Sequence, residues 1–312
     1  MEGFDDLLSP EDDNFHVPGE HKWWHETCFF YFYVPERRIG CWLYNYVRPN
    51  IGVAGGGCWV WDDRTFFHME APYYACYSAL PLPDHRDLRD FTFPSGVRVQ
   101  CEKPIERYRL TYTDRDWIDI DVCWQAIQNP WVRASGDPPQ PYHWEQFGHV
   151  TGHLTLGGDR LEVDCLAMRD RTWSPRSEKW KDGGGGSYAS AAVSGDLNFL
   201  ATGGDRITGF MTMEGERHAI VNCTRQAERR TEHGYVTRLV LDAEDTLGRT
   251  MHMEGLPVSR LAMPLPGLSA VVWTSTVQWS INGEPCWGED QDPWPLLRWS
   301  ELRRSGRAGV QV

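Results

Sequence analysis

The stretch that decides the fold is HVTGHLTLGGDRLEVDCLAM, residues 149–168. Its two arms, 149–156 and 160–168, are short runs rich in apolar and β-branched residues, which is typical of strands. The glycines between them supply the backbone freedom that a tight hairpin turn needs. The same GGDR recurs at 203–206, again before a strand-like run. A phosphate-binding glycine loop should lead into a helix instead, so both copies predict β-hairpins.

Strand-like runs between turn signals fill both halves of the chain, and long helical periodicity is absent. About eight strands in each half predict an all-β protein with two tandem lipocalin-like antiparallel β-barrels or strongly curved sheets. A barrel of eight strands is just wide enough for one small ligand. The expected strands are 28–34, 39–47, 57–61, 66–70, 73–79, 97–102, 108–113, 118–127, 149–156, 160–168, 188–201, 206–213, 218–227, 235–243, 248–255 and 270–281.

The domain boundary is predicted in the Pro- and Gly-rich stretch NPWVRASGDPPQP, residues 129–141. A chain of 312 residues has room for two domains, so we expect an N-terminal lipocalin-like domain over 1–135 and a C-terminal one over 136–312. GGGGS at 183–187 is expected to be a mobile surface loop inside the second domain.

The charge balance excludes some classes of partner. Forty-four acidic residues outnumber 31 basic ones, for a net charge of -13. Phosphate backbones and anionic membrane surfaces need clustered bases, so nucleic acid is not an expected partner.

The sequence also carries signals about location. The acidic N-terminus has no secretory pattern, and the chain has no run of about 18 apolar residues that could span a membrane. The nine cysteines are scattered singly, which is typical of reduced thiols in the cytoplasm.

Tryptophan is unusually abundant, with 16 residues. Indole rings supply a large apolar area together with one polar N–H. They are expected to fill the core, and some of them to line a site for a hydrophobic small molecule.

LAMRDRTWSPR (166–176) is the most informative motif. Strand alternation puts Met168 and Asp170 on one face and Arg169 on the other. The pattern has two interpretations: a salt-bridged strand end covered by Trp173, or an acid in a cavity held by arginine. Because Arg169 and Arg171 flank Asp170 in the sequence, a close guanidinium would lower rather than raise its pKa.

PYHWEQFGH (141–149) lies just before the decisive hairpin. If the two arms pair, His143 or Glu145 would approach Asp170 across the hairpin. Hydrogen bonding between domains is the alternative role for these side chains.

Metal and cofactor chemistry is not expected. His21 and His25 are four residues apart, as are His149 and His153. On a strand this spacing spans roughly 13 Å, whereas two ligands of one zinc ion must lie within about 4 Å of each other. The chain also has no GxSxG and no dinucleotide-binding fingerprint after a strand.

Two elements resemble the tandem lipocalin-like hydratase superfamily, which includes carotenoid 1,2-hydratases, kievitone hydratase-like enzymes and fungal decalin-forming Diels–Alderases. A closer likeness is to uncharacterised bacterial members. The first element is WWHET at 23–27, and the second is RDRTWSPR at 169–176 with HWEQ at 143–146 and GH at 148–149 upstream. The resemblance is specific around 142–176 and loose elsewhere. Met168 stands where the carotenoid enzymes carry a tyrosine, which argues against a carotenoid substrate.

The resemblance implies a cofactor-independent hydratase or dehydratase acting on an alkene of an isoprenoid-like or polyketide-like molecule. Asp170, His143 and Glu145 are the expected catalytic residues. A polyene cyclase or pericyclase and a non-catalytic carrier of lipid, steroid or terpenoid are the alternatives, and homodimerisation is left open. The expected substrate-binding residues are Trp173, Arg169, Gln146, Trp59, Trp61, His68, Glu70, His25 and Trp24.

Overall fold

A computed structural model describes residues 7–176, 186–264 and 269–305. The chain forms two compact units. Among the described residues, the sheet unit comprises 7–61 and 71–176, and the barrel unit comprises 62–70, 186–264 and 269–305. The expected loop at 183–187 lies mostly outside the described residues.

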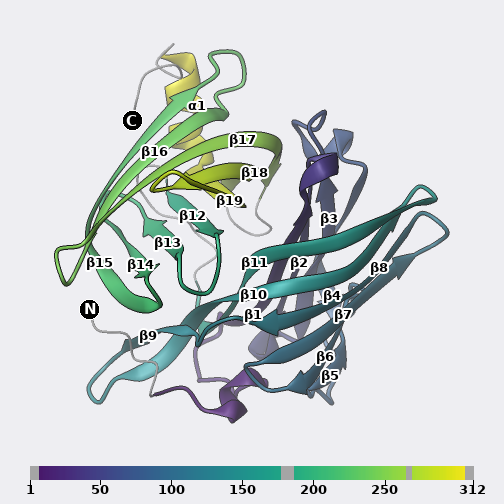
Figure 1. The fold of residues 1–312 in the computed structure, drawn as a ribbon. Coiled ribbons are helices and arrows are strands. Elements are labelled where there is room, and N and C mark those ends of the chain that lie inside the picture. The colour runs from purple at the N-terminus through teal and green to yellow at the C-terminus, as the bar shows by residue number, and fades with distance from the viewer. Residues whose placement is uncertain (1–6, 177–185, 265–268, 306–312) are drawn as a thin grey trace. The chain divides into compact units, whose positions relative to one another are not determined.

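The sheet unit is one antiparallel half-barrel of eleven strands in the order β4-β3-β2-β1-β11-β10-β8-β7-β6-β5, with β9 paired to β10 (Figure 1). The all-β prediction is therefore confirmed. Its strands are β1 (Trp24–Val34), β2 (Ile39–Arg48), β3 (Val53–Trp61), β4 (Tyr73–Pro81), β5 (Asp90–Thr92), β6 (Arg98–Lys103), β7 (Arg107–Asp114), β8 (Ile118–Ala126), β9 (Trp131–Ser135), β10 (Gln140–Leu156) and β11 (Asp159–Pro175).

The decisive hairpin forms the centre of this sheet. Strands β10 and β11 pair from Leu156↔Asp159 to His143↔Thr172, and β11 continues the sheet by pairing with β1. Gly157 and Gly158 both have positive φ in the turn, as the GGDR interpretation requires. The division of the chain differs from the expected boundary at 135/136, because the Pro- and Gly-rich stretch contains β9 and its turn into β10, which pair inside one sheet.

The barrel unit contains a closed barrel of consecutive antiparallel strands (Figure 1). The second GGDR forms the turn between β13 and β14. A helix, α1 (Leu296–Arg304), follows the last strand. The strands are β12 (Ser187–Ala192), β13 (Asn198–Gly203), β14 (Ile207–Met213), β15 (Glu216–Arg229), β16 (Val236–Asp245), β17 (Thr250–Pro264), β18 (Ala270–Ile281) and β19 (Glu284–Pro295).

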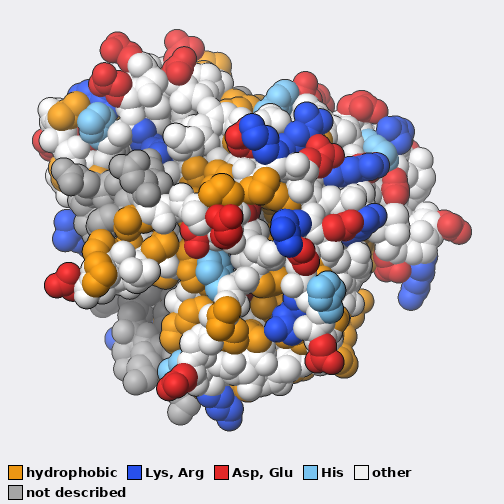
Figure 2. All heavy atoms as spheres, turned by 90° about the horizontal axis from the view of Figure 1, so that it is seen from below, with side chains coloured by type: hydrophobic (Ala, Val, Ile, Leu, Met, Phe, Trp, Pro, Cys, Tyr) orange, Lys and Arg blue, Asp and Glu red, His pale blue; other side chains and the backbone are white. Residues whose placement is uncertain are grey.

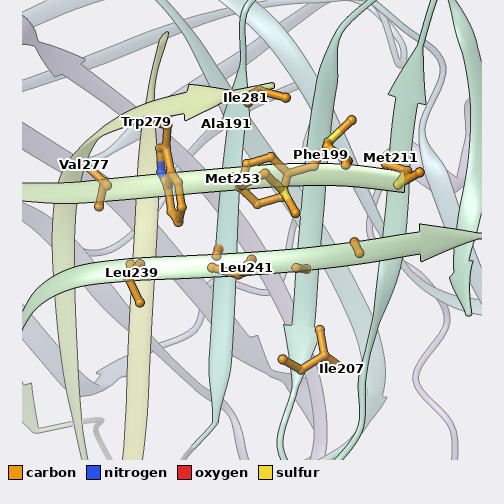
Figure 3. Packing of buried hydrophobic residues seen from close by; sticks show 14 of the residues in the cluster. Ala191, Phe199, Ile207, Met211, Leu239, Leu241, Met253, Val277, Trp279 and Ile281 are labelled. Atoms are coloured by element: carbon orange, nitrogen blue, oxygen red, sulfur yellow. The ribbon is translucent and has the colours of Figure 1, made fainter. Parts of the chain in front are cut away.

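Alternating apolar residues of these strands form one buried cluster (Figure 3). At its centre the rings of Phe199 and Trp279 meet edge to face, with centroids 5.2 Å apart. Leu239, Leu241 and Met253 are completely buried beside them. This part of the barrel interior is therefore filled with side chains.

Several expected elements are corrected. The run 66–70 is not a strand: it contains the 3-10 helix η5 (His68–Glu70), and the carboxylate of Glu70 accepts the N–H groups of Phe66 and Phe67. The run 188–201 is two strands, β12 and β13, rather than one. Strands β5, β9 and β19 and helix α1 were not expected. Other short 3-10 turns are η2 (Pro10–Asp13), η3 (Pro35–Arg37) and η4 (Pro49–Ile51).

A buried ion pair fixes the N-terminal segment to the inside of the half-barrel. Arg169 donates to Asp13 at 2.8 Å, and both side chains are at most 3 % exposed. The Arg169 guanidinium lies 3.7 Å from the ring centroid of Tyr108 and 4.2 Å from that of Trp144. Asp13 also accepts the N–H of Ile105 at 2.5 Å. The aromatic faces and the carboxylate together compensate a charge that has lost its water.

The surface carries charges of both signs. On the face drawn in Figure 2, Lys and Arg side chains lie among Asp and Glu side chains. Exposed cross-strand pairs such as Arg98–Asp90 and Arg109–Asp121 show the same mixing. In the described part of the chain, no helix is long and apolar enough to cross a membrane.

Replacing Asp13 with Asn should destabilise the protein strongly, because Arg169 would remain buried without its counter-charge. We expect a loss of about 3–5 kcal/mol in the free energy of unfolding, measured by denaturant titration. Asp90→Asn, which breaks the exposed pair with Arg98, is the matched control and should cost at most about 1 kcal/mol. Equal effects of the two substitutions would contradict the proposed importance of the buried pair.

Candidate functional site

Strand alternation at the centre of the half-barrel separates two sets of polar residues. Asp170 lies directly opposite Glu145 of β10 and Phe29 of β1, so these three side chains share one face of the sheet. Arg169 and Arg171 lie on the other face. This register confirms the hypothesis that His143 or Glu145 approaches Asp170 across the hairpin. Glu145 is the direct cross-strand partner of Asp170, and His143 lies opposite Thr172, two residues further along β11.

Aromatic rings cover the same face beside Asp170. Phe29 is followed across the sheet by Tyr44 of β2, with ring centroids 6.2 Å apart, and Tyr44 stacks on Trp59 of β3 at 5.8 Å. Trp42 meets Phe29 at 5.0 Å and Trp61 at 6.2 Å. We call Phe29, Trp42, Tyr44, Trp59 and Trp61 the aromatic face. All but the partly buried Tyr44 are buried.

Asp170 is partly buried, and its carboxyl has a pKa raised from 3.8 to about 6. Desolvation by the surrounding protein is the largest cause, and the negative charge of Glu145 adds to it, whereas His143, Arg176 and Arg171 act in the opposite direction. The flanking arginines of the sequence therefore do not prevent the pKa of Asp170 from rising, because the fold turns Arg169 and Arg171 to the opposite face.

Glu145 is completely buried but is held in its charged form. Its Oε1 atom accepts from His143 Nε2 at 2.8 Å and from Arg133 Nη2 at 3.1 Å. Desolvation opposes the charge, but His143 and Arg133 outweigh it and lower the pKa of Glu145. The other nitrogen of His143 lies 2.7 Å from the hydroxyl of Thr172, so the imidazole is fixed between the two strands. Two neighbouring carboxyl groups thus have pKa values shifted in opposite directions.

Several buried polar atoms on this face have no hydrogen-bond partner among the described residues. They include Glu145 Oε2, His25 Nε2 and Thr27 Oγ1, and the indole Nε1 atoms of Trp59 and Trp61. Buried polar atoms in native proteins are rarely unpaired, and those that are often have a functional reason. Because these atoms lie on the face that carries Asp170 and the aromatic rings, they are candidate hydrogen-bonding groups for a bound molecule.

Four of the expected substrate-binding residues face the other side of the sheet. Gln146 donates to the backbone carbonyls of Ile105 and Gln128. Trp173 stacks on His16, with centroids 4.2 Å apart, and Trp24 donates to Glu26. Together with Arg169 in its ion pair, these side chains build the inside of the half-barrel. The structure therefore does not bring Trp173, Arg169, Gln146 and Trp24 to Asp170.

His68 and Glu70 belong to a different unit from Asp170. They lie in η5, within the segment 62–70 that packs with the barrel unit. The carboxylate of Glu70 is used in capping the turn before it. The residues that the structure does place on the Asp170 face are His143, Glu145, His25, Trp59 and Trp61.

Sequence reasoning missed Tyr44, Arg133, Thr27 and Phe29. Tyr44 receives a hydrogen bond from Arg176, and its pKa is raised by burial. Alternation within 24–34 and 39–48 would have put Thr27, Phe29 and Tyr44 on shared faces, but only the β1–β11 register shows that they adjoin Asp170. Arg133 lies in a strand that the sequence did not predict.

The described residues of this site do not form a set of metal ligands. Within residues 7–176, 186–264 and 269–305, no group of three or more His, Cys, Asp or Glu side chains is arranged to hold a metal ion. His149 and His153 lie on β10 and contact different carboxylates, those of Asp164 and Asp119.

The family described as Domain of unknown function (DUF7064) matches residues 9–289. The chain belongs to this family. No protein among those with curated functions matches this DUF7064 chain in sequence.

Solved structures of the same fold include kievitone hydratase from Nectria haematococca, which is 11% identical, with a TM-score of 0.51 over 94% of each chain. CghA is 10% identical, with a TM-score of 0.52 over 93% of this chain and 96% of its own. CghA with Sch210972 gives a TM-score of 0.51 at 8% identity. The resemblance to the lipocalin-like hydratase superfamily is thus confirmed at the level of the fold.

Asp170→Asn should stabilise the protein above pH 6. The folded state raises the pKa of Asp170 from 3.8 to about 6, so the folded protein binds this proton more tightly than the unfolded chain does. The free energy of unfolding of the wild type therefore falls as pH rises from about 4 to about 6. Asparagine avoids this cost, and we expect a gain of about 3 kcal/mol at pH 8 and about half of that at pH 5.

Denaturant unfolding at the two pH values measures this difference. Asp164→Asn, on the same strand but exposed, is the control and should show no comparable gain. A pH-independent or destabilising effect of Asp170→Asn would mean that the carboxyl is not desolvated in the folded protein.

Proposed function

We propose that the protein is a cofactor-independent hydro-lyase that adds water to, or removes it from, a trisubstituted alkene of a hydrophobic isoprenoid-like or polyketide-like small molecule. One observation carries the proposal. Asp170, with a pKa of about 6, and Glu145, with a lowered pKa, are neighbours on an aromatic face. Oppositely shifted carboxyl groups identify an acid and a base within one site.

Asp170 acts as the proton donor in hydration. Its neutral carboxyl transfers the proton to the less substituted alkene carbon, so that the O–H bond breaks and a C–H bond forms from the alkene π electrons. The more substituted carbon becomes a tertiary cation, and Asp170 is left as a carboxylate. A pKa of about 6 keeps a useful fraction of this acid protonated near neutral pH.

The aromatic face stabilises the cation. Ring faces are electron-rich and attract positive charge, more strongly where water is excluded. Tyr44 and Trp59 stack at 5.8 Å beside Phe29, the residue directly opposite Asp170. A cation formed at Asp170 would therefore lie near these rings.

Glu145 positions and deprotonates the water. Its Oε2 atom has no partner among the described residues, whereas Oε1 is held by His143 and Arg133. Water bound at Oε2 attacks the cation as Glu145 takes its proton, and a C–O bond forms. Transfer of that proton from Glu145 to the neighbouring Asp170 carboxylate restores both groups. Dehydration follows the same steps in reverse.

The known proteins of this fold support the proposal without deciding it. Kievitone hydratase carries hydration in its name, and CghA has been crystallised with the small molecule Sch210972. At 8–11% identity these likenesses show the fold alone. The argument for a hydro-lyase over a cyclase or a carrier therefore rests on the Asp170–Glu145 pair, since a carrier has no need of a destabilising buried acid.

Incubation with a panel of prenylated and terpenoid alkenes in heavy-oxygen water should yield a labelled alcohol detectable by mass spectrometry. Asp170→Asn and Glu145→Gln should each lower kcat/KM by about 10²–10⁴-fold. In the wild type, kcat/KM should fall as pH rises through about 6, because Asp170 ionises. Asp164→Asn is the matched control and should retain full activity.

Cyclised products without label would favour the cyclase alternative. Tight binding with no chemical change across the panel would favour a carrier. An Asp170→Asn variant with undiminished label incorporation would remove Asp170 from the mechanism.

A further inference from the structure

His25 lies on the same face of β1 as Phe29, four residues earlier along the strand. Because Phe29 is directly opposite Asp170, the Cα of His25 is roughly 13 Å from the level of Asp170 along the strand direction. The ring stacks on Tyr46, with centroids 4.9 Å apart and an interplanar angle of 21°. The imidazole is therefore fixed at the far end of the face that carries the proposed acid.

The two ring nitrogens of His25 have different surroundings. Arg48 Nε donates to Nδ1 at 3.0 Å, so Nδ1 must accept and cannot carry a proton. Burial, together with the charges of Arg176 and Arg48, lowers the pKa of His25 well below its ordinary value. A neutral ring with an accepting Nδ1 has its proton on Nε2. That N–H is buried and has no partner among the described residues.

We infer that His25 Nε2–H binds a carbonyl or phenol oxygen of the substrate, and that the substrate is an oxygenated isoprenoid-like molecule rather than a hydrocarbon polyene. This inference rests on the proposed function, because it takes the reacting alkene to lie at Asp170. A buried N–H rejects a ligand that leaves it unpaired. Arg48 and Arg176 add a positive potential that favours an oxygen atom and disfavours a cationic group.

The spacing adds a length requirement. The backbone positions of His25 and Asp170 are offset by roughly 13 Å along the strand, so a substrate that reaches both side chains needs an oxygen and an alkene at well-separated ends. The aromatic rings of Tyr44 and Tyr46, with centroids 6.3 Å apart, lie side by side on this face. A prenylated ketone or phenol with its alkene at the far end meets both requirements.

Two probes that differ only at the oxygen test this inference. Farnesylacetone has a ketone at one end and a trisubstituted alkene at the other, and its matched hydrocarbon has a methylene group in place of the carbonyl oxygen. Binding is measured by quenching of tryptophan fluorescence. The wild type should bind the ketone about tenfold more tightly than the hydrocarbon.

Variants at His25 assign the preference to this residue. His25→Phe keeps a ring against Tyr46 but has no donor, so it should bind the two probes equally. His25→Gln can accept from Arg48 and donate an N–H, so it should restore much of the preference. His149→Phe, a partly exposed position in the middle of β10 whose ring contacts Asp164, is the control and should bind as the wild type does. Thermal unfolding checks that each variant is folded.

Equal affinity of the wild type for both probes, or failure to bind either, would overturn the inference, as would a His25→Phe variant that still prefers the ketone. The proposed function is judged separately by incorporation of heavy oxygen. Labelled product without a ketone preference would remove only the role of His25. A ketone preference without any labelled product would support the role of His25 as a binding residue and count against the hydro-lyase.

Discussion

The alternation of side chains along β11 is the constraint on which the rest of the sheet unit depends. Successive residues of a strand point to opposite faces, and β11 pairs on both sides, with β1 and β10. Arg169 and Arg171 consequently enter the packed interior, where Asp13 and aromatic rings compensate their charge. Asp170 is left on the opposite face, apart from the guanidinium groups that adjoin it in the sequence. A shift of register by one residue would exchange the two sets.

The same alternation separates structural from chemical roles among similar residues. Glu145 and Gln146 are consecutive, yet one lies beside Asp170 and the other ties two backbone carbonyls on the inner side. Trp59 belongs to the aromatic face, whereas Trp144 packs over Arg169 in the interior. A large number of tryptophans therefore serves two purposes in this sheet, and residue type alone does not tell them apart.

Much of the fold could be predicted from the sequence because hairpin turns and strand composition are local signals. The GGDR turns and most strands follow from them. The acidic β19 could not be predicted in this way, because Asp290 and Asp292 are compensated by Arg225 and Arg229 from the distant β15. The expected boundary was misplaced for a similar reason: proline and glycine mark a turn, but pairing partners decide to which unit the turn belongs.

The site could be predicted only where its residues are close together in the sequence. The hairpin fixed the approach of His143 and Glu145 to Asp170, since both arms are close in sequence. The sequence could not show that Trp173, Arg169 and Gln146 lie on the face away from Asp170. The aromatic surroundings of each face depend on the pairing of β11 with β1, and these two strands are more than 130 residues apart in the sequence.

The segment 62–70 leaves the sheet between β3 and β4 and packs with strands far along the chain, through a bridge between Phe67 and Ala262. Neither a cut at 135 nor one at 178 would therefore yield two pieces that keep all their partners. For recombination between relatives, the two units are not interchangeable modules: an exchange of one of them would need joints at 61/62, at 70/71 and between 176 and 186 together.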